Sequence, residues 1–440
     1  MNPAAIRAAM PVDVARVMRA LRTAGFGAYV VGGAVRDVLV GRTPADWDLA
    51  TEATPDQMRI IFPNAEYENR FGTVGVPTEA GIVREVTTFR ADGASSDARR
   101  PDSIVFLRRI EGDLARRDFT INAMAFGLAP ESSRRLDPVT DSALIDPYGG
   151  ADDLAAGILR AVGDPAERFR EDALRMLRAI RFAARFALTI EPATAAAIQH
   201  DAGLAARLSG ERIGAEMDGV LAAARPALAL QSAYDLGLIA AIAPALAADW
   251  TVEIPKRVES IGDAAGTPEY DPLGRLAELF AQIVDDEDVA ATLESWRRPR
   301  ATIHEIRTIR TIDRMSNEAE LAGGGRARAI DLRIAAAIAN GDARDAARQL
   351  RRRIATGRAS ACATSMLAAC EAADADALPA TAHDLAIDGD LLVAHCGEAP
   401  GAWVGKLLDQ LVVDAAHGRV PNTADALLSR AAEVRRSSLP

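Results

Sequence analysis

The sequence predicts an α+β protein in which strands and helices are mixed up to about residue 150 and helices form the remainder. Residues 29–31 favour a buried strand, a glycine pair and a short helical stretch follow, and a second strand is expected around residues 46–51. Residues 82–89 alternate in the way that a further strand would. From residue 164 onward, apolar side chains recur at helical spacing almost throughout, so the rest of the chain is expected to be helical.

The length of the chain indicates more than one domain, because a single hydrophobic core rarely serves 440 residues. We expect four parts: a mixed head over residues 1–150, a helical neck over 151–225, a helical body over 226–375 and a helical tail over 376–440. The apolar fraction of 49% and the aromatic fraction of only 5% fit an ordered, helix-rich protein.

The charge and the apolar pattern limit the partners. The net charge is −11, so a surface for nucleic acid would have to be a local basic patch. No stretch reaches the ~18 uninterrupted apolar residues of a membrane helix, and residues 1–10 lack the apolar run of a signal peptide. We therefore expect no membrane partner and a cytoplasmic location.

The glycine pair Gly32 and Gly33 has the features of a phosphate-binding turn. Glycine lets the backbone turn sharply and leaves no side chain between the amides and an incoming phosphate. The helix expected next directs its first N–H groups toward the same place, and Arg36 lies within it. A glycine pair after a strand is more often a simple turn, so this signal is weak on its own.

Three carboxylates follow the glycine turn. Asp46 and Asp48 are two residues apart in the expected strand, so their side chains would leave the same face. Paired carboxylates on a rigid face suit Mg²⁺, which takes a few carboxylates together with substrate phosphates. Solvated acids are the ordinary alternative. Glu85 lies on the face of its strand that Val83 and Thr87 share, where it is either an edge-strand acid or a third metal-site carboxylate.

Two later stretches offer groups that could bind a nucleotide. In residues 111–125 (EGDLARRDFTINAMA), Arg117 can bind phosphate oxygens bidentately, with Asp118 and Asn122 nearby. A solvated charged helix is the alternative for this stretch. This stretch, and a second one at residues 171–181, indicate nucleotide binding more strongly when they are considered together with the glycine turn.

Residues 171–181 (EDALRMLRAIR) have helical spacing. Asp172, Arg175 and Arg178 are three residues apart and neighbours on one stripe, and Arg181 lies further round. A carboxylate accepts from the exocyclic amine of a base and a guanidinium donates to ring acceptors, so the stripe could read a base edge. A salt-bridged surface helix is the alternative.

These stretches resemble the bacterial tRNA nucleotidyltransferase (CCA-adding) and poly(A) polymerase family of the DNA polymerase β superfamily, on residues 29–51, 82–89, 111–125 and 171–181. The resemblance implies a polymerase-β-like nucleotidyltransferase head, with a small mixed sheet and helices, followed by an all-α neck, body and tail. It implies template-independent addition of C, C and A to the 3′ end of tRNA from CTP and ATP, with release of pyrophosphate and Mg²⁺ as cofactor.

The resemblance also implies roles for single residues. Asp46 and Asp48 are expected to be catalytic and to hold the metal, and Glu85 is expected to be catalytic. The nucleotide-binding residues that it implies are Gly32, Gly33, Arg36, Arg117, Asp118, Asn122, Asp172, Arg175, Arg178 and Arg181. Residues 210–217 resemble the motif that stabilises the neck helix, and the tail is expected to bind tRNA.

Other functions stay open at this point. A poly(A) polymerase would use the same head, and so would a specialised enzyme that adds only CC or only A. A nucleotide-binding RNA chaperone that kept the fold but lost the chemistry is a further alternative, against which the intact Asp46 and Asp48 argue. Arginines cluster over residues 296–314 and again over 344–358, where they are candidate tRNA phosphate contacts or solvated helix charge.

Overall fold

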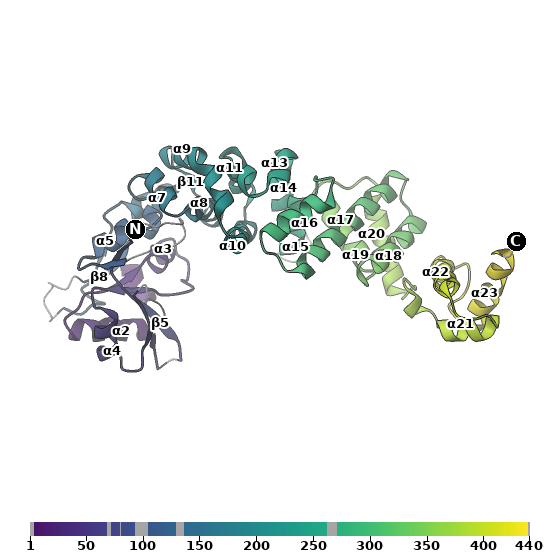
Figure 1. Cartoon of the computed structure of the whole chain (residues 1–440), viewed down its shortest axis with the longest axis horizontal. Coiled ribbons are helices and arrows are strands. Elements are labelled where there is room, and N and C mark those ends of the chain that lie inside the picture. Colours follow the sequence, from purple (N-terminus) through teal and green to yellow (C-terminus); the bar gives the residue numbers. More distant parts are fainter. Residues whose placement is uncertain are drawn as a thin grey trace. The chain divides into compact units, whose positions relative to one another are not determined.

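The computed structural model of the protein describes residues 4–67, 72–79, 81–92, 104–128, 136–261 and 271–438. The chain divides into two compact units, residues 1–247 and 248–440. A small mixed sheet lies in the first unit and helices make up the second, which confirms the predicted α+β class (Figure 1). The finer division into head, neck, body and tail stays a prediction. No described helix is long and apolar enough to cross a membrane.

The head is built on a seven-stranded sheet with the order β3-β4-β5-β2-β1-β8-β9. These strands are β1 (Ala28–Val31), β2 (Leu49–Thr51), β3 (Glu66–Tyr67), β4 (Thr73–Pro77), β5 (Val83–Thr88), β8 (Ala125–Leu128) and β9 (Ala143–Ile145). Within the described sheet, β2 and β5 are parallel and the other neighbours are antiparallel. All four residues of the central β1 are buried, because β2 and β8 flank it.

Smaller elements complete the head. Strands β6 (Arg90–Asp92) and β7 (Ile104–Phe106) form an antiparallel ribbon. The helices are α1 (Ala4–Ala9), α2 (Val12–Thr23), α3 (Gly33–Leu39), α4 (Pro55–Ile61), α5 (Ile110–Ala115), the 3-10 turn η1 (Thr120–Asn122) and α6 (Gly150–Ala156). The start of α4 is fixed by a capping box, in which Thr54 and Gln57 each accept a hydrogen bond from the other's backbone N–H.

The helices that follow the head pack around α8 (Leu174–Phe186), which contacts α10 (Gly210–Leu221) and α11 (Ala227–Asp235) (Figure 1). The remaining elements of this part are α7 (Pro165–Glu171), α9 (Pro192–Asp201), η2 (Ala202–Arg207), α12 (Leu238–Ile242), α13 (Pro244–Ala248) and the parallel strands β10 (Ile158–Leu159) and β11 (Thr189–Ile190). Met176, Ile180 and Met217 are buried between α8 and α10, so one face of α8 is committed to the core and the other is left for the head.

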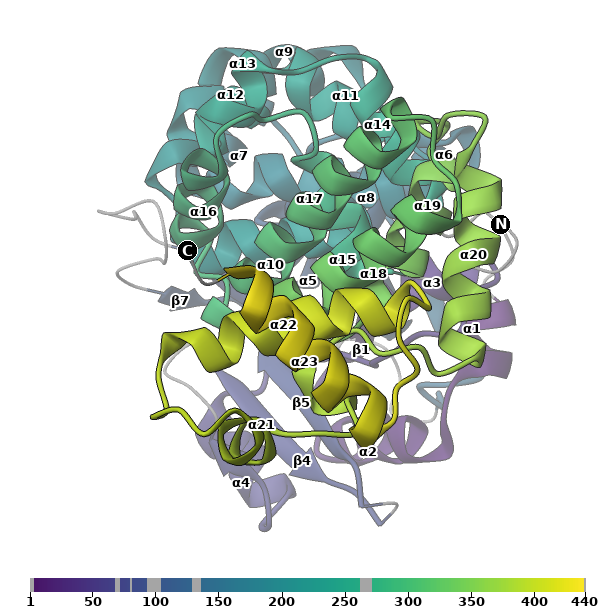
Figure 2. The same cartoon turned by 90° about the vertical axis from the view of Figure 1, so that its right-hand side faces the viewer.

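The second unit is helical. Its elements are α14 (Glu253–Ser260), α15 (Pro272–Leu279), α16 (Asp286–Ser295), α17 (Arg300–Leu321), α18 (Arg326–Asn340), α19 (Asp345–Ala355), α20 (Ala363–Ala375), η3 (Ala382–Asp384), α21 (Gly389–Cys396), α22 (Ala402–Ala416) and α23 (Ala424–Ser438). Helices α21, α22 and α23, at the yellow end of the colour scale, pack together (Figure 2). Ile330 and Ile334 of α18 share a core with Leu411 and Leu427, which anchors these three helices to the rest of the unit.

Candidate active site

An open pocket of about 510 Å³ lies between the head and α8 of the first unit. Ten of the predicted site residues contribute to its wall or stand at its edge. Its lining contains Gly33, Arg36, Asp48, Arg117, Asp118, Asn122, Asp172, Arg175, Arg178 and Arg181. Stretches that are far apart in the sequence therefore meet in one place, as the resemblance implies.

The glycine turn lies at one wall of this pocket. Gly32 has a φ of +65°, a left-handed conformation that side chains rarely adopt. A Cβ atom at this position would lie 2.4 Å from Nη1 of Arg117, which donates a hydrogen bond of 3.2 Å to the carbonyl of Asn122. Because Gly32 has no side chain, the Arg117 guanidinium can pack directly against the turn between β1 and α3. Cationic and backbone N–H groups therefore lie close together there.

The two aspartates precede β2 instead of lying within it, which corrects the predicted strand over residues 46–51. Strand β2 begins at Leu49, although the Asp48 carbonyl accepts from Val31 N–H at 3.0 Å and so continues the pairing by one residue. Asp46 accepts from Trp47 N–H at 2.7 Å and lies 3.6 Å from Arg84. The side chain of Asp46 is 64% exposed, which leaves oxygen atoms accessible to a cation.

The pKa of Asp48 is raised above its usual value. Crowding by protein atoms is the larger cause and the negative charge of Asp46 is the second, while Arg117 acts in the opposite direction. Two carboxylates that repel each other, one of them in the lining of a pocket, are the arrangement that a bound cation would stabilise. The donor set therefore fits a divalent ion, which needs only one or two protein carboxylates when substrate phosphates complete the shell.

Glu85 does not line the pocket. Within the described ranges, no group of three His, Cys, Asp or Glu side chains is close enough to hold a metal ion. The backbone register nevertheless brings Glu85 near the aspartates, because the parallel pairing of Leu49 with Val86 sets Asp48 and Glu85 one residue earlier on their strands. Leu49 and Val86 are buried while Asp48 and Glu85 are exposed, so both acids are on the same side of the sheet.

A chain of hydrogen bonds joins the second stretch to the first and the third. Arg36 donates from Nη1 to Asn122 Oδ1 at 2.5 Å, and Asn122 Nδ2 donates to Asp118 Oδ1 at 3.0 Å. Arg178 on α8 donates from Nε to Asp118 Oδ2 at 2.7 Å. Burial opposes the charge of Asp118, but Arg178 and the hydrogen bonds outweigh it and hold the pKa of Asp118 below its usual value. The head and α8 are thus tied together at the wall of the pocket.

The third stretch is not one continuous helix, which corrects the predicted stripe of Asp172, Arg175 and Arg178. Helix α7 ends at Glu171, Asp172 is extended with φ −151°, and α8 begins at Leu174. Asp172 accepts from Leu174 N–H at 3.0 Å, so its carboxylate caps the first turn of α8. Asp172 still lines the pocket beside Arg175, but it does so from the break between two helices.

Residues outside the predicted set also act on this wall. Arg116, Arg185 and Phe182 line the pocket, and Nη2 of Arg212 on α10 donates to both carboxylate oxygens of Asp172, at 3.0 and 2.8 Å. Arg212 belongs to the stretch 210–217 that resembles a stabilising motif, and this contact shows what that stretch holds in place. The i, i+4 spacing of Arg178 and Phe182 was the sequence signal that could have identified Phe182.

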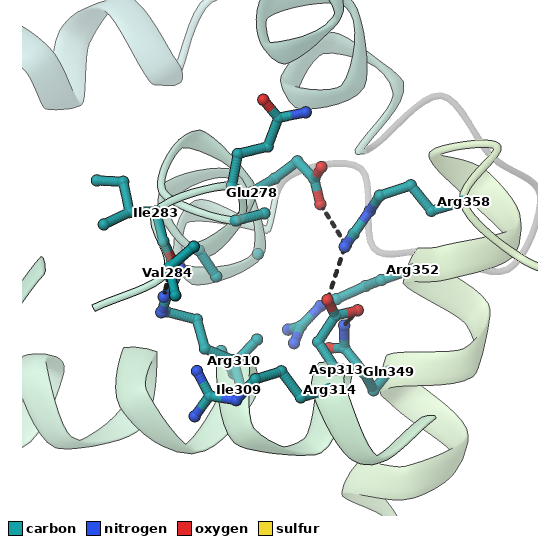
Figure 3. Close-up of a pocket in the computed structure, with 14 residues that line it drawn as sticks. Glu278, Ile283, Val284, Ile309, Arg310, Asp313, Arg314, Gln349, Arg352 and Arg358 are labelled. Atoms are coloured by element: carbon teal, nitrogen blue, oxygen red, sulfur yellow. Dashed lines mark hydrogen bonds and ion pairs between the residues drawn. The ribbon is translucent and has the colours of Figure 1, made fainter. Parts of the chain in front are cut away.

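The arginine clusters of the second unit are partly internal, since two of their arginines are buried and the others are half-buried or exposed. Arg310 and Arg353 are 5% and 4% exposed. Arg310 donates to the carbonyls of Phe280 and Ile283, and Figure 3 shows the guanidinium of Arg358 between Glu278 and Asp313, at 2.6 and 2.7 Å. These arginines balance buried acids around a cavity of about 220 Å³, so they are not available to phosphates. Exposed members such as Arg307 and Arg344 stay predicted tRNA contacts.

Three family models match the chain in succession. Residues 28–160 match the "Poly A polymerase head domain". Residues 187–249 match the "Probable RNA and SrmB- binding site of polymerase A", and residues 353–431 match the "tRNA nucleotidyltransferase domain 2" model. The first match spans the whole seven-stranded sheet, and the first and second flank α8, which carries the third stretch of the pocket.

Curated relatives and solved structures extend the match over almost the whole chain. The CCA-adding enzyme of Geobacillus kaustophilus is 34% identical over 407 residues and covers 90% of both chains, and that of Geobacillus stearothermophilus is 32% identical with 96% of each chain covered. The crystal structure of the Bacillus stearothermophilus CCA-adding enzyme in complex with CTP aligns with a TM-score of 0.73 and 29% identity, covering 97% of this chain and 99% of that one. This chain therefore belongs to the CCA-adding enzyme family and is a tRNA nucleotidyltransferase.

Proposed function

We propose that the pocket between the head and α8 is the place where this nucleotidyltransferase binds CTP or ATP and joins it to tRNA. The reaction is the template-independent addition of C, C and A to the 3′ end of tRNA, with release of pyrophosphate. The observation that carries the assignment of the site is the meeting of three distant stretches in one pocket, with the Asp48 carboxylate in its lining. We propose that the enzyme works in the cytoplasm and that the tail, which overlaps the tRNA nucleotidyltransferase match, contacts tRNA.

Nucleotidyltransferases generally use divalent metal ions, and we propose that Mg²⁺ is held here by Asp46 and Asp48. When bound, the ion would lower the pKa of the attacking 3′-hydroxyl and neutralise charge on the leaving pyrophosphate. Glu85 is the third catalytic carboxylate in this proposal, and the shared register with Asp48 supports it. The carboxylates orient the reacting groups from a rigid sheet edge, and no covalent enzyme intermediate is needed.

The triphosphate and ribose positions follow from the polar groups nearest the glycine turn. The backbone of Gly32 and Gly33, the guanidinium of Arg117 and that of Arg36 would bind phosphate oxygens. Asp118 and Asn122 are buried, at 8% and 6% exposure. They are joined by a hydrogen bond, so they form a fixed wall beside the ribose. Backbone amides and guanidiniums act on every nucleotide alike, so these residues would set affinity and not base choice.

Base choice belongs to the α7–α8 break and the start of α8. Cytosine and adenine each present an amine next to a ring nitrogen acceptor, whereas uracil and guanine present a carbonyl in that place. Asp172 can accept from the amine and Arg175 can donate to the ring nitrogen, so the two side chains select C and A without a template. We assign Arg178 and Arg181 supporting roles, because Asp118 and Glu216 hold their Nε atoms at 2.7 and 2.5 Å.

Product sequencing tests the proposed function directly. Purified protein, Mg²⁺, CTP and ATP are incubated with a tRNA transcript that lacks its last three nucleotides. We expect a product ended by C, C and A, with incorporation stopping there. Long adenosine tracts on any RNA would instead identify a poly(A) polymerase, and addition that stops after CC or requires a CC end would identify a specialised enzyme.

Arg175→Ala is expected to blur base selection. Arg175 is held by Glu171 at 2.7 Å and by the carbonyl of Arg116 at 3.0 Å, so its remaining N–H groups have a fixed direction. Losing them should cost about 1–3 kcal/mol of discrimination against UTP and GTP, the range for one bidentate base contact. The measurement is kcat/KM for all four nucleotides. Arg170→Ala is the control, because Arg170 is an exposed residue of α7. Equal selectivity in Arg175→Ala and Arg170→Ala would remove Arg175 from base reading.

A further inference from the structure

Two phenylalanine rings on α8 face the arginines of the pocket. Phe182 and Phe186 are four residues apart on the helix, and their ring centroids are 6.2 Å from each other. The guanidinium carbon of Arg36 lies 5.2 Å from the Phe182 centroid and 4.5 Å from that of Phe186. Arg181 lies 4.6 Å from the Phe182 ring. These distances are within the range of cation–π attraction.

One of the two rings, Phe182, is held from behind by the core. Phe119, which is fully buried, meets Phe182 edge to face at 5.8 Å with an interplanar angle of 81°. Phe119 lies in the head, directly after Asp118, so the position of the Phe182 ring is fixed by the part of the molecule that carries Arg36. We call the two rings, Phe182 and Phe186, the aromatic platform. Because Phe119 of the head packs against Phe182, the geometry of this platform does not depend on the arginines alone.

Hydrogen bonds to Asp37 and Asn122 hold the guanidinium group of Arg36. Its Nε and Nη2 donate to Asp37 Oδ1 at 2.8 and 2.6 Å, and its Nη1 donates to Asn122. Among the described residues, these bonds use three of the five N–H donors that an arginine has. Two N–H donors of Arg36 are then left for a phosphate. In-plane hydrogen bonds do not stop a guanidinium from tilting, whereas an aromatic ring against its flat face does.

Positive charge is crowded beside these rings, although each arginine also has a carboxylate partner. Arg36, Arg178, Arg181 and Arg185 all line one pocket, and burial together with the charge of Arg185 lowers the pKa of Arg36, against the attraction of Asp37. The negative face of an aromatic ring stabilises a cation without adding a further carboxylate that would repel a triphosphate. A phenylalanine can therefore hold these arginines apart while the pocket stays attractive to an anion.

We infer that Phe182 and Phe186 are positioning residues that hold Arg36 in the orientation in which it receives the triphosphate of CTP or ATP. This inference rests on the proposed function and deepens it, because it names the structural reason for the direction of a phosphate-binding arginine. Since the triphosphate is common to both substrates, loss of the platform changes affinity for CTP and ATP equally and leaves base selection intact.

Phe186→Leu and Phe186→Tyr test the inference as a pair. Leucine keeps an apolar side chain but has no π face, whereas tyrosine keeps the ring. With Phe186→Leu we expect KM for CTP and for ATP each to rise about tenfold, with kcat within about twofold of the wild type and the ratio of the two KM values unchanged. Phe186→Tyr should restore both KM values. Thermal melting of each variant reports whether a change is structural.

Phe169→Leu is the matched control, because Phe169 is a fully buried ring of the adjacent α7 and does not line the pocket. Its loss of volume should lower the melting temperature without raising KM. The inference is overturned if Phe186→Leu and Phe186→Tyr have the same KM values, or if only one nucleotide is affected. If wild-type protein incorporates neither nucleotide, the proposed function fails instead, so the two failures are distinguishable. Should Phe186→Leu not fold, Phe186→Met offers the same comparison.

Discussion

Asp48→Asn is expected to lower kcat for CMP addition by about three orders of magnitude. The replacement keeps the shape of the side chain and removes the charge that we assign to metal binding, and metal neutralisation contributes several kcal/mol to the transition state, at about 1.4 kcal/mol for each factor of ten. Asp46→Ala should behave alike. Affinity for tRNA, measured by filter binding, should be nearly unchanged, because the loss falls on the chemical step.

A second measurement separates a metal role from a general loss of structure. Asp46 raises the pKa of Asp48, and that repulsion is what a cation relieves, so Asp48→Asn should need a higher Mg²⁺ concentration for half-maximal activity. Asp152→Asn is the control, because Asp152 is an exposed acid in the first turn of α6. If Asp48→Asn turned over at the rate of Asp152→Asn, Asp48 would have no place in the mechanism.

The local signals of the head could be read from the sequence because they depend on neighbouring residues. A glycine pair that must adopt a positive φ at Gly32 is visible in the chain itself. So is the threonine, proline and glutamine pattern that starts α4. The pocket could not be derived in this way, because it joins residues more than a hundred positions apart; only the resemblance predicted that they would meet.

The predicted helical stripe was wrong because a spacing rule does not include partners that lie far along the chain. The helical period runs through Glu171, Asp172 and Ala173 without a glycine or proline, so the one local signal of the break is Asp172 as a candidate N-cap. The break is stabilised by Arg212, forty residues later. In the same way, spacing could not show which arginines of the two clusters are paired inside the unit, because the acids that neutralise Arg358, such as Glu278, lie far along the chain.

The contact between Asp118 and Arg178 couples the pocket wall to the stability of the first unit. Asp118 is 8% exposed, and its two carboxylate oxygens accept hydrogen bonds from different donors. Oδ1 accepts from Asn122 Nδ2 and from Phe119 N–H, at 3.0 and 2.9 Å, and Oδ2 accepts from Arg178. An asparagine has only one oxygen, so in either amide orientation an NH₂ group would face a donor.

Asp118→Asn is therefore expected to destabilise the first unit by ~3 kcal/mol, the low end for breaking a buried pair because the Arg178 side chain is 33% exposed. At about 2–4 °C for each kcal/mol, the unfolding transition of this unit should fall by roughly 6–12 °C in a thermal melt. Replacing both partners by apolar residues, Asp118→Leu with Arg178→Met, should cost less than Asp118→Asn alone, because no charge is then left unpaired.

The lowered pKa of Asp118 also predicts how the stability difference between wild type and Asp118→Asn changes with pH. The folded-state pKa of Asp118 lies below its ordinary value of 3.8, so its contribution to stability is present above that value and is lost as the pH falls through the folded-state pKa. The difference in melting temperature between wild type and Asp118→Asn should hold from about pH 7 to about pH 5 and shrink below the ordinary pKa. A difference that grew on acidification would mean that Asp118 is protonated in the folded protein, and Arg178 would then need another partner to stay charged at the pocket wall.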